Sequence, residues 1–344
     1  MHYSLDTKGG LNLVAIGGGT GLSTLLAGLK RRVGKQDDAD LWIENLSAIV
    51  TVSDDGGSSG RLRDELQMLP PGDIRNCMIA LSEDSTLLSR LFRYRFRGDG
   101  DLGGHSFGNL FLAALTEVTG DFVEAVRLSS EVLASKGHIY PATINDVRLV
   151  AELEDGSVVR GETQITASKS RIRSLRLEPE KCLPLPGALA AIRKADVITV
   201  GPGSLYTSIL PNLLVARVAR AIGASDATKI FICNLMTQPG ETDDYTALRH
   251  LETVKQYAPE IHFEFIVVNS QRVTEEQRRR YAADGAHQIG LDDDALEGTV
   301  NGDTEVVQAD LLDEGEMARH DSDKLASVVI ACRQQALSRP TVTA

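Results

Sequence analysis

The sequence predicts an α/β protein with a Rossmann-like, doubly wound and mainly parallel sheet, together with a small antiparallel β insertion. Three observations lead to this prediction. Short apolar runs alternate with segments in which apolar residues recur every three to four positions, as strands alternating with helices do. Two glycine-rich turns each follow such an apolar run. Between residues 147 and 159 the apolar residues instead alternate with polar ones, which is typical of paired antiparallel strands.

The first predicted unit is a strand, a glycine turn and a helix. Residues 11–16 form the apolar run, residues 17–21 read GGGTG, and residues 22–29 place leucines on one face. Glycines at such a turn let backbone amides approach a phosphate, which the start of the helix favours. The turn is not a Walker A loop, and Ser23 and Thr24 stand where a dinucleotide fingerprint has its third glycine. A phosphate cradle and a plain turn both remain open here.

The second predicted unit ends in an acidic loop. Residues 46–52 form a buried strand that runs into SDDGGSSG at 53–60. Ligands of parallel sheets lie at this edge, so Asp54 and Asp55 are candidates for binding a ribose hydroxyl or a Mg²⁺ ion that bridges phosphates. The alternative is an ordinary Asp-Gly turn. Asp73 is predicted to cap a helix that ends near residue 81.

Polar residues between glycines mark a third loop, GHSFGN at 104–109. His105 is a candidate for contacting a phosphate or transferring a proton, and Asn109 for contacting a base or hydroxyl group. A structural cap is an equally good interpretation of either residue. Just before this loop, residues 87–97 mix arginines with aromatic residues, and we favour a solvated helix or strand edge over a site for single-stranded nucleic acid.

After an insertion, the second half of the chain repeats the pattern of a strand followed by a glycine turn. We assign residues 1–139 and 181–344 to one Rossmann-like nucleotide-binding domain, and residues 140–180 to a small β-hairpin insertion. In the second half a strand at 197–200 precedes the glycine turn GPGS at 201–204. Strands are also predicted at 229–233 and 263–268. The loop after the first of them has Asn234, Gln238 and Glu241 as polar candidates, and a capped loop is the alternative. Two glycine turns of this kind favour a nucleotide or phosphorylated ligand between them.

Composition limits the partners. The chain has 344 residues, of which 42% are hydrophobic, and its 36 basic and 48 acidic residues give a net charge of −12. This balance argues against nucleic acid or an anionic membrane as a general partner. Residues 284–323 hold thirteen acidic residues and one arginine, Arg319. A solvated acidic face explains this segment, and the alternative is that Arg319 contacts an anion.

The cysteines and apolar runs predict a cytoplasmic location. Four cysteines form no CxxC pair and have no zinc-like spacing to histidine, so they are predicted to be reduced. No apolar run reaches the roughly 18 residues of a membrane span. Residues 1–12 lack the apolar stretch of a signal peptide.

Six segments are distinctive in combination. They read AIGGGTGLSTLLAGLK, AIVTVSDDGGSSGRLR, PPGDIRNC, GHSFGNLFLAAL, GPGSLYTSILPNLLV and CNLMTQPGET. Together they resemble the gluconeogenesis factor family, bacterial relatives of 2-phospho-L-lactate transferase, from about Leu11 to Asp321. The resemblance implies a cytoplasmic protein with a transferase-type Rossmann-like fold that binds a UDP-sugar such as UDP-N-acetylglucosamine. It also implies a role in cell shape and cell-wall synthesis during growth on gluconeogenic carbon sources.

The resemblance also assigns site residues. Near the C-terminus Tyr281 matches a stacking or hydroxyl contact and Arg319 a phosphate partner, while Ser322 is a candidate phosphorylation site at a helix start. The predicted ligand-binding residues are Gly18, Gly19, Thr20, Gly21, Asp54, Asp55, Asn109, Gly201, Gly203, Ser204, Asn234, Tyr281 and Arg319, with Asp54 and Asp55 as the candidate Mg²⁺ ligands.

Two functional hypotheses remain open. A non-catalytic sensor of a nucleotide diphosphate-sugar, acting on protein partners in cell-wall synthesis, is favoured because the residues show no evident nucleophile or base. The alternative is a transferase that uses a guanosine diphosphate-linked donor and Mg²⁺, as the transferase relatives do. A homodimer, formed through exposed apolar surface on the insertion, is a further expectation that the sequence alone does not decide.

Overall fold

A computed structural model describes residues 9–35, 41–83, 87–168, 170–290, 299–300 and 304–339, and confirms the predicted fold class. One sheet has the strand order β10-β11-β9-β8-β7-β1-β2-β3, and a second has the order β5-β4-β6. Seven strands of the large sheet are parallel, and β10 pairs antiparallel with β11. The strands are β1 (Gly9–Gly17), β2 (Leu41–Val50), β3 (His138–Pro141), β4 (Arg148–Leu153), β5 (Val158–Arg160), β6 (Ile172–Glu178), β7 (Val197–Val200), β8 (Thr228–Ile232), β9 (Phe265–Asn269), β10 (Thr299–Val300) and β11 (Thr304–Ala309).

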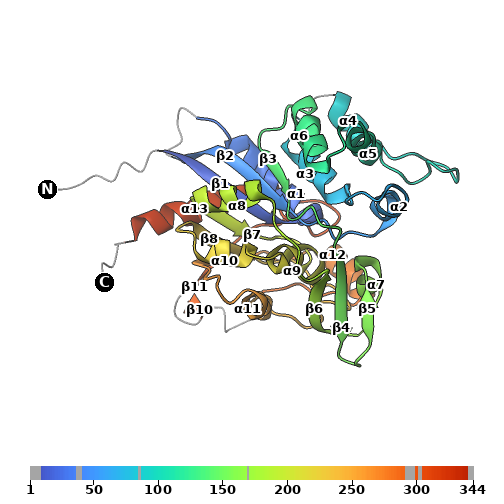
Figure 1. Ribbon diagram of the computed structural model, residues 1–344. Helices are drawn as coiled ribbons and strands as arrows, with labels where there is room; N and C mark the ends of the chain where they lie inside the picture. Colours follow the sequence, from blue (N-terminus) through green and yellow to red (C-terminus); the bar gives the residue numbers. More distant parts are fainter. Residues whose placement is uncertain are drawn as a thin grey trace.

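The order of the strands creates a switch point at the centre of the sheet. The chain adds β2 and β3 on one side of β1, and then crosses over to add β7, β8, β9 and β11 on the other side (Figure 1). In an open parallel sheet, the crevice outside the carboxyl ends of the strands is widest where this reversal occurs. The ends of β1 and β7 are therefore where a ligand is expected.

Helices cover both faces of the large sheet, with α1, α3 and α13 packed side by side and α8, α9, α10 and α11 on the other face (Figure 1). The helices are α1 (Gly19–Leu29), α2 (Gly57–Leu66), α3 (Gly72–Leu81), α4 (Leu87–Arg93), α5 (Phe107–Thr119), α6 (Phe122–Val132), α7 (Glu162–Ala167), α8 (Pro186–Lys194), α9 (Leu210–Leu214), α10 (Val218–Gly223), α11 (Ala247–Tyr257), α12 (Glu275–Ala283) and α13 (Ser322–Ser338), with a short 3₁₀ turn at Lys30–Arg32 and a π turn at Leu205–Ile209.

The apolar runs of the sequence become the strands that are buried on both faces. All residues of β7, β8 and β9 are buried, because helices lie above and below them. The leucines that the sequence placed on one face of α1 are fully buried between the sheet and α13. Cutting one such leucine back to alanine costs about 2–5 kcal/mol of unfolding free energy.

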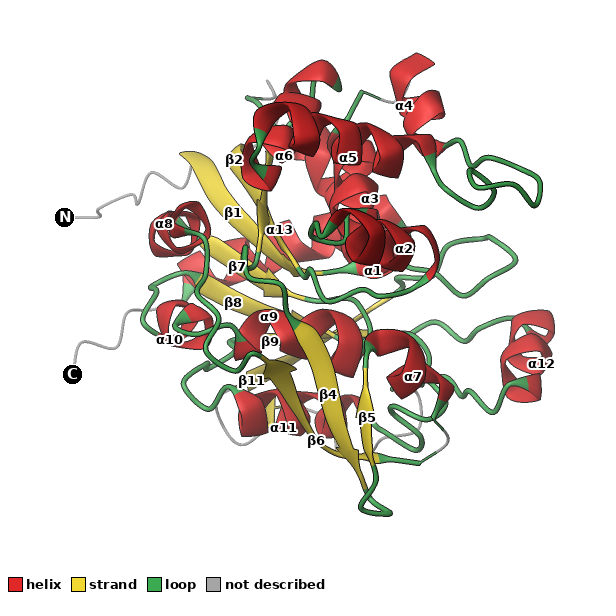
Figure 2. Ribbon diagram, turned by 45° about the vertical axis from the view of Figure 1, so that its right-hand side comes forward, coloured by secondary structure: helices red, strands yellow, loops and turns green. Residues whose placement is uncertain are grey.

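The insertion is a three-stranded antiparallel sheet with one helix. Leu149, Ala151 and Leu153 of β4 are buried, as the period of two predicted, but Val150 on the opposite face is buried as well, and only Arg148 and Glu152 are more exposed. The strands lie below the large sheet, with α7 beside β5 (Figure 2). The backbone N–H of Leu175 donates to Tyr257 Oη of α11 at 2.8 Å, which ties the insertion to the larger domain. The predicted hairpin did not include α7, and the first two residues of the 140–180 segment belong to β3 of the large sheet.

Other features bear on the predictions. All four cysteines are buried and free, as predicted for reduced residues. Across the described ranges, no helix combines the length and apolarity that crossing a membrane requires. Asp73 does not cap α3: that helix begins at Gly72, its N-cap is Pro71, and no side chain makes a cap hydrogen bond. The carboxylate of Asp73 faces elsewhere, as described below.

Candidate functional site

The two glycine turns meet in direct backbone contact at the switch point. The first turn follows β1 and opens α1, and the second follows β7. A Cβ atom placed on Gly21 would lie 2.4 Å from the carbonyl oxygen of Pro202 and 2.9 Å from the backbone nitrogen of Gly203. One placed on Gly203 would lie 3.4 Å from the carbonyl oxygen of Gly18. The turns thus come from distant parts of the sequence but share one edge of the sheet.

The backbone at this edge has one amide already engaged. Gly18 is the N-cap of α1 and has no side chain to cap the helix, while the backbone N–H of Gly19 donates to the carboxylate of Asp73. Gly19 has φ +61° and Gly201 has φ +86°, values that favour glycine at both turns. Open helix-start amides together with the helix dipole attract anions.

Polar side chains from the loop after β8 hold the second turn in place. Asn234 Oδ1 accepts a hydrogen bond from the backbone N–H of Gly203 at 3.0 Å. Gln238 Nε2 donates to Ser204 Oγ at 2.7 Å. Asn234 therefore contributes to the site at least partly by fixing the turn, and the amide of Gly203 is already engaged.

A cleft of about 330 Å³ lies beside these turns, and we call it the β1–β7 cleft. Of the predicted residues, it is lined by Thr20, Gly21, Gly203, Ser204, Asn234, Tyr281 and Arg319. The remaining predicted glycines, Gly18, Gly19 and Gly201, belong to the same two turns. The structure thus brings together the two glycine turns, Tyr281, which the resemblance had assigned, and Arg319, which both the charge distribution and the resemblance had indicated.

Arg319 is the cation of the cleft. Its side chain is exposed and forms no ion pair with any residue that the structure describes. Tyr281 is half-buried in the same cleft, packed with Leu235 and Met236, and its Oη donates to the backbone oxygen of Ala318, the residue before Arg319, at 3.4 Å. An exposed guanidinium and an aromatic ring in one cleft suit a phosphate and a planar group.

Two buried polar atoms on the cleft wall have no hydrogen-bond partner within the described part of the chain. They are Gln238 Oε1 and His320 Nε2. Burial lowers the pKa of His320 to about 4, opposed by a hydrogen bond with the backbone of Cys233, so this imidazole is neutral at pH 7. Buried atoms of this kind usually have partners, and a ligand would reach these two only if the side chains that cover them moved.

Beyond the first glycine turn lies a set of carboxylates, which we call the carboxylate group: Asp54, Asp73, Glu162 and Glu241. They come from the loop after β2, from α3, from α7 of the insertion and from the loop after β8. A Cβ atom on Gly18 would lie 2.7 Å from Asp73 Oδ2, so the group begins directly behind the turn.

Burial and mutual repulsion raise the pKa values of these carboxyls. The pKa of Glu162 rises to about 9, first through burial and then through Asp54 and Asp73. The pKa of Asp73 rises to about 6 through burial and Asp54, opposed by the Gly19 amide and Arg75. Burial raises the pKa of Glu241 to about 7, opposed by a hydrogen bond from Thr166, and Glu241 Oε2 has no partner among the described residues. Such a group binds protons readily and would bind a cation favourably.

The two predicted Mg²⁺ ligands differ in their contacts. Asp55 Oδ1 accepts from the backbone N–H and the hydroxyl of Thr163, at 2.9 and 2.8 Å, and so holds the insertion. Asp54 Oδ1 accepts from the backbone N–H of Gly56 at 2.8 Å, and its other oxygen is free of hydrogen bonds within the described residues. Those residues contain no group of three or more His, Cys, Asp or Glu placed to hold a metal ion. Mg²⁺ often needs only one or two carboxylates plus phosphate oxygens, which Asp54 fits.

Asn109 belongs to an internal hydrogen-bond network. Its Nδ2 donates to Ser58 Oγ at 3.0 Å, and its Oδ1 accepts from Arg75 Nη1 at 3.1 Å. Ser58 Oγ also lies 2.9 Å from His105 Nδ1. Burial, and then Arg61, lower the pKa of His105. Asn109 does not line the β1–β7 cleft, and its predicted role in ligand contact remains a prediction.

Ser322 and the acidic segment complete the set. Ser322 begins α13, and its Oγ accepts from Arg31 Nη2 at 2.6 Å. Its phosphorylation remains a prediction. Residues 291–298 and 301–303 of the acidic segment lie outside the described residues.

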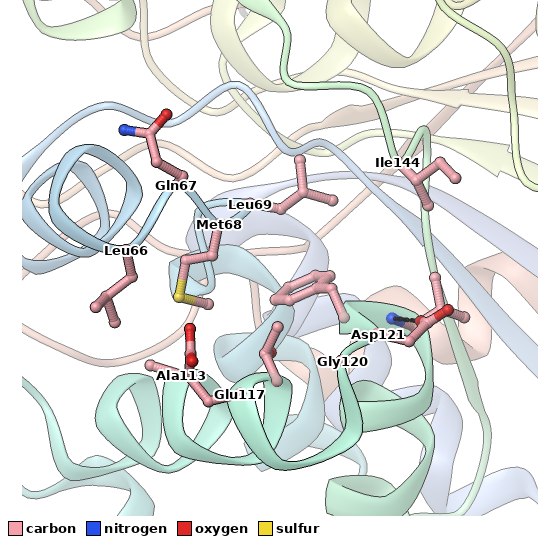
Figure 3. A pocket seen from close by; sticks show the side chains of 12 residues that line it. Leu66, Gln67, Met68, Leu69, Ala113, Glu117, Gly120, Asp121 and Ile144 are labelled. Atoms are coloured by element: carbon pink, nitrogen blue, oxygen red, sulfur yellow. Dashed lines mark hydrogen bonds between the residues drawn. The ribbon is translucent and has the colours of Figure 1, made fainter.

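A larger hollow of about 440 Å³ lies elsewhere, between the end of α2 and helices α5 and α6 (Figure 3). Its lining mixes apolar side chains, including Leu66, Met68 and Leu69, with polar ones such as Glu117 and Asp121, and contains none of the predicted site residues. The glycine turns that predicted a ligand lie instead at the β1–β7 cleft.

Sequence reasoning missed several residues of the site. Asp73 was assigned to a helix cap, and Glu162 fell inside the insertion without attracting notice. His320 gave only the weak signal of a polar residue beside Arg319, whereas Gln238 and Glu241 were among the polar candidates of the loop that begins at Asn234. A signal that could have found Asp73 was its position in the PPGDIRNC segment, which is one of the six distinctive segments.

Comparison with known proteins places the chain. A family model for 2-phospho-L-lactate transferase CofD matches residues 13–312. The gluconeogenesis factor of Bacillus subtilis is 45% identical over 319 residues, 92% of this chain and 96% of that protein. The gluconeogenesis factor of Halalkalibacterium halodurans is 43% identical over 319 residues, 93% of this chain and 95% of that protein. A crystal structure of a UPF0052 family member from Bacillus halodurans has a TM-score of 0.85 at 42% identity, covering 93% of this chain and 99% of that one. The chain therefore belongs to the 2-phospho-L-lactate transferase CofD family, as its resemblance to the gluconeogenesis factors predicted.

Proposed function

We propose that the protein binds a nucleotide diphosphate-sugar, UDP-N-acetylglucosamine or a close analogue, in the β1–β7 cleft and acts as a regulatory protein. The observation that carries this proposal is the backbone contact between the two glycine turns beside a cleft that ends at an unpaired arginine. A diphosphate needs donors on two sides. The start of α1 beyond Gly19 would supply the amides of Thr20 and Gly21, and Arg319 would supply a charge-assisted hydrogen bond.

The rest of the cleft is suited to the nucleoside and the sugar. Tyr281 offers an aromatic face, on which a base stacks favourably. Gln238 Oε1 and His320 Nε2 accept hydrogen bonds that hydroxyl or N–H groups of the ligand would donate. Filling these two atoms removes the cost of leaving buried acceptors unpaired, about 1–3 kcal/mol each.

A regulatory role is supported by the lining of the cleft. Among the described residues that line it there is no carboxylate, and its histidine has a depressed pKa, so no strong base faces the ligand. The relatives from Bacillus subtilis and Halalkalibacterium halodurans are named gluconeogenesis factors. The proposal includes what the resemblance implied: a cytoplasmic location and a role in cell shape and cell-wall synthesis on gluconeogenic carbon sources, exerted through protein partners.

A second candidate function is a Mg²⁺-dependent transferase that uses a guanosine diphosphate-linked donor. The carboxylate group favours it, because carboxyls with raised pKa values lie directly behind the phosphate-facing turn. Asp54 would be a ligand of Mg²⁺, which would neutralise phosphate charge when bound. The matching family model also bears the name of a transferase.

Isothermal titration tests the first function. The protein is titrated with UDP-N-acetylglucosamine, UDP, GDP and N-acetylglucosamine alone, each with and without Mg²⁺. We expect binding of the UDP-sugar, weaker binding of UDP, and none of the free sugar. Absence of heat at millimolar UDP-sugar would refute the proposal.

The second function has its own readout. The protein is incubated with the guanosine diphosphate-linked phospholactate donor, a deazaflavin acceptor and Mg²⁺, and the product is followed by mass spectrometry. Product that disappears in Asp54→Asn would establish the transferase, whereas UDP-sugar binding without product would establish the sensor.

A further inference from the structure

A buried asparagine of α9, Asn212, links the two glycine turns from behind the β1–β7 cleft. Its Nδ2 donates to the backbone oxygen of Gly17 at 3.0 Å and to that of Ser208 at 2.8 Å. Gly17 is the last residue of β1 and directly precedes the first turn, whereas Ser208 lies in the π turn that follows the second. Asn212 is fully buried and does not line the cleft, so a ligand bound there would not touch it.

Ser208, one of the two residues that Asn212 holds, lies where the turns meet. A Cβ atom placed on Gly203 would lie 3.2 Å from Ser208 Cβ, and one placed on Gly18 would lie 3.4 Å from the same atom. One placed on Gly19 would lie 3.7 Å from Ser208 Oγ. The side chain of Ser208 therefore adjoins glycines of both turns, and a bond that fixes its backbone also fixes the relation between the turns.

The π turn gives Ser208 this position. The backbone N–H groups of Ser208 and Ile209 both donate to the carbonyl oxygen of Ser204, each at 2.9 Å. Such a wide turn departs from the regular α-helix, and single π turns are frequent at functional sites. The π turn ends where α9 begins, so Asn212, four residues after Ser208, reaches both carbonyl oxygens with one amide group.

Asn212 would be a costly residue if stability were its only role. Its Oδ1 is buried and has no hydrogen-bond partner within the described residues. A buried acceptor of this kind destabilises the fold, which a leucine of similar shape would not do. Gly17 also does not depend on Asn212 for a partner, because its oxygen accepts from the backbone N–H of Thr51 at 3.0 Å. The hydrogen bonds of Asn212 therefore point to a geometric role, which is to place one turn against the other.

We propose that Asn212 is a positioning residue that holds the two glycine turns at the separation a diphosphate requires. The inference rests on the proposed function, because only a ligand with two linked phosphates needs both turns at once. Gly21 of the first turn and Ser204 of the second both line the cleft. If the turns shift relative to each other, a diphosphate loses contacts with one of them, whereas a single phosphate can adjust to either turn.

Calorimetric titration of the full chain with UDP-N-acetylglucosamine, UDP and UMP tests the proposal. In Asn212→Leu, both diphosphate ligands should bind about tenfold more weakly than they bind the wild type, or weaker still, because their two phosphates contact both turns. UMP should stay within about twofold of its wild-type affinity, because its phosphate needs one turn. The ratio of UDP affinity to UMP affinity is therefore the quantity that Asn212 controls.

A second substitution separates positioning from stability. Asn212→Ala removes the same two hydrogen bonds but also leaves a cavity, so it should unfold at a lower temperature than Asn212→Leu. Both variants should nevertheless lower the ratio of UDP affinity to UMP affinity alike. Val126→Ala in α6 is the control: it also leaves a cavity in the core, but Val126 does not line the cleft, so the ratio should keep its wild-type value.

Hydrogen exchange of the ligand-free protein gives a readout that does not depend on nucleotide binding. In Asn212→Leu, peptides that cover residues 17–22 and 201–209 should exchange faster than in the wild type, while peptides from α6 should not change. If the wild type binds no nucleotide, the proposed function fails, and faster exchange would still show that Asn212 holds the turns.

Three results would overturn the proposal. They are an unchanged ratio of UDP affinity to UMP affinity in both Asn212 variants, an equal change of that ratio in Val126→Ala, and ligand-free exchange of the two turns in Asn212→Leu that matches the wild type.

Discussion

The first glycine turn separates two environments of contrasting chemistry. On one side, the β1–β7 cleft offers open amides, neutral acceptors and the free guanidinium of Arg319. On the other, the carboxylate group gathers Asp54, Asp73, Glu162 and Glu241, whose shared burial raises the pKa of the last three. Both sets touch the same few residues of backbone, since Gly18 faces Asp73 and Gly21 faces Pro202.

This contrast indicates how a ligand would be oriented. An anionic group is stabilised on the cleft side and would be repelled by ionised carboxyls on the other. A cation, or groups that donate hydrogen bonds, would be stabilised on the carboxylate side. A diphosphate lying across the turn would meet both requirements if a divalent cation or the sugar hydroxyls faced the carboxyls. The variants below test the two sides separately.

The largest effect is expected from adding a side chain where the backbones of the two glycine turns touch. In Gly21→Ala, the added methyl group would meet the backbone of Pro202 and Gly203, which cannot rotate away. We expect unfolding free energy to fall by about 1–3 kcal/mol and UDP-sugar binding to be lost. Thermal unfolding and calorimetric titration measure the two effects. Gly100→Ala is the control, since nothing lies within 4 Å of its Cβ position. Wild-type UDP-sugar binding by Gly21→Ala would show that the contact between the turns does not form the binding site.

The cleft side alone is tested by Arg319→Ala. Removing the unpaired guanidinium should cost about 1.5–3 kcal/mol of binding, which is roughly a ten- to hundredfold weaker UDP-sugar affinity. Stability should not change, because the side chain is exposed and unpaired among the described residues. Arg280→Ala is a matched control, as Arg280 instead contacts Glu276 and Glu316 on α12 and nearby. Equal loss in both variants would mean that Arg319 acts only through long-range charge.

The carboxylate side alone is tested by Glu162→Gln. The pKa of this carboxyl rises on folding from 4.5 to about 9, so stability present below pH 4.5 is lost as the pH rises through about 9. Glutamine does not ionise. The variant should therefore lose less stability than the wild type between pH 5 and pH 9, as measured by urea unfolding at several pH values. Glu154→Gln, at an exposed hairpin position, should keep the wild-type profile. Identical profiles for wild type and Glu162→Gln would show that this carboxyl is solvated.

The smallest effect on UDP-sugar binding is expected at Asp55, which is next to the carboxylate group but contacts the insertion. Asp55→Ala removes the two hydrogen bonds to Thr163 and should lower the unfolding free energy by about 1–2 kcal/mol. UDP-sugar affinity, followed by titration, should stay within about twofold of wild type, because the side chain is turned toward the insertion. A large loss of affinity would restore Asp55 to the ligand-binding role that the sequence predicted.

The sequence revealed the central sheet because strands buried on both faces leave continuous apolar runs. The runs at 11–16, 197–200 and 263–268 became β1, β7 and β9 with small shifts at their ends. Strand β11 was missed because it lies near the edge of the sheet and several of its residues are only partly buried. The glycine turns were visible as motifs, and their contact followed from the reversal of strand order.

The carboxylate group was not visible in the same way. Its members come from four segments that are separated by up to 187 positions, from Asp54 to Glu241, and no local spacing links them. Asp73 has the position of a helix cap in the sequence, yet its neighbours in space turn it toward Gly18. Raised pKa values arise only when the tertiary structure excludes water from several carboxyls at once.

The meeting of β1 and β7 also has a thermodynamic consequence. Each half of the large sheet contributes residues to the cleft, so a diphosphate would add a link between two halves that also meet along β1 and β7 and through the packing of α1 on α13. Saturating ligand at a hundred times its dissociation constant would then add about 2.7 kcal/mol to global stability. Hydrogen exchange should therefore slow in both halves together when ligand binds. The free energy of unfolding of this protein would then rise with the cellular concentration of the ligand.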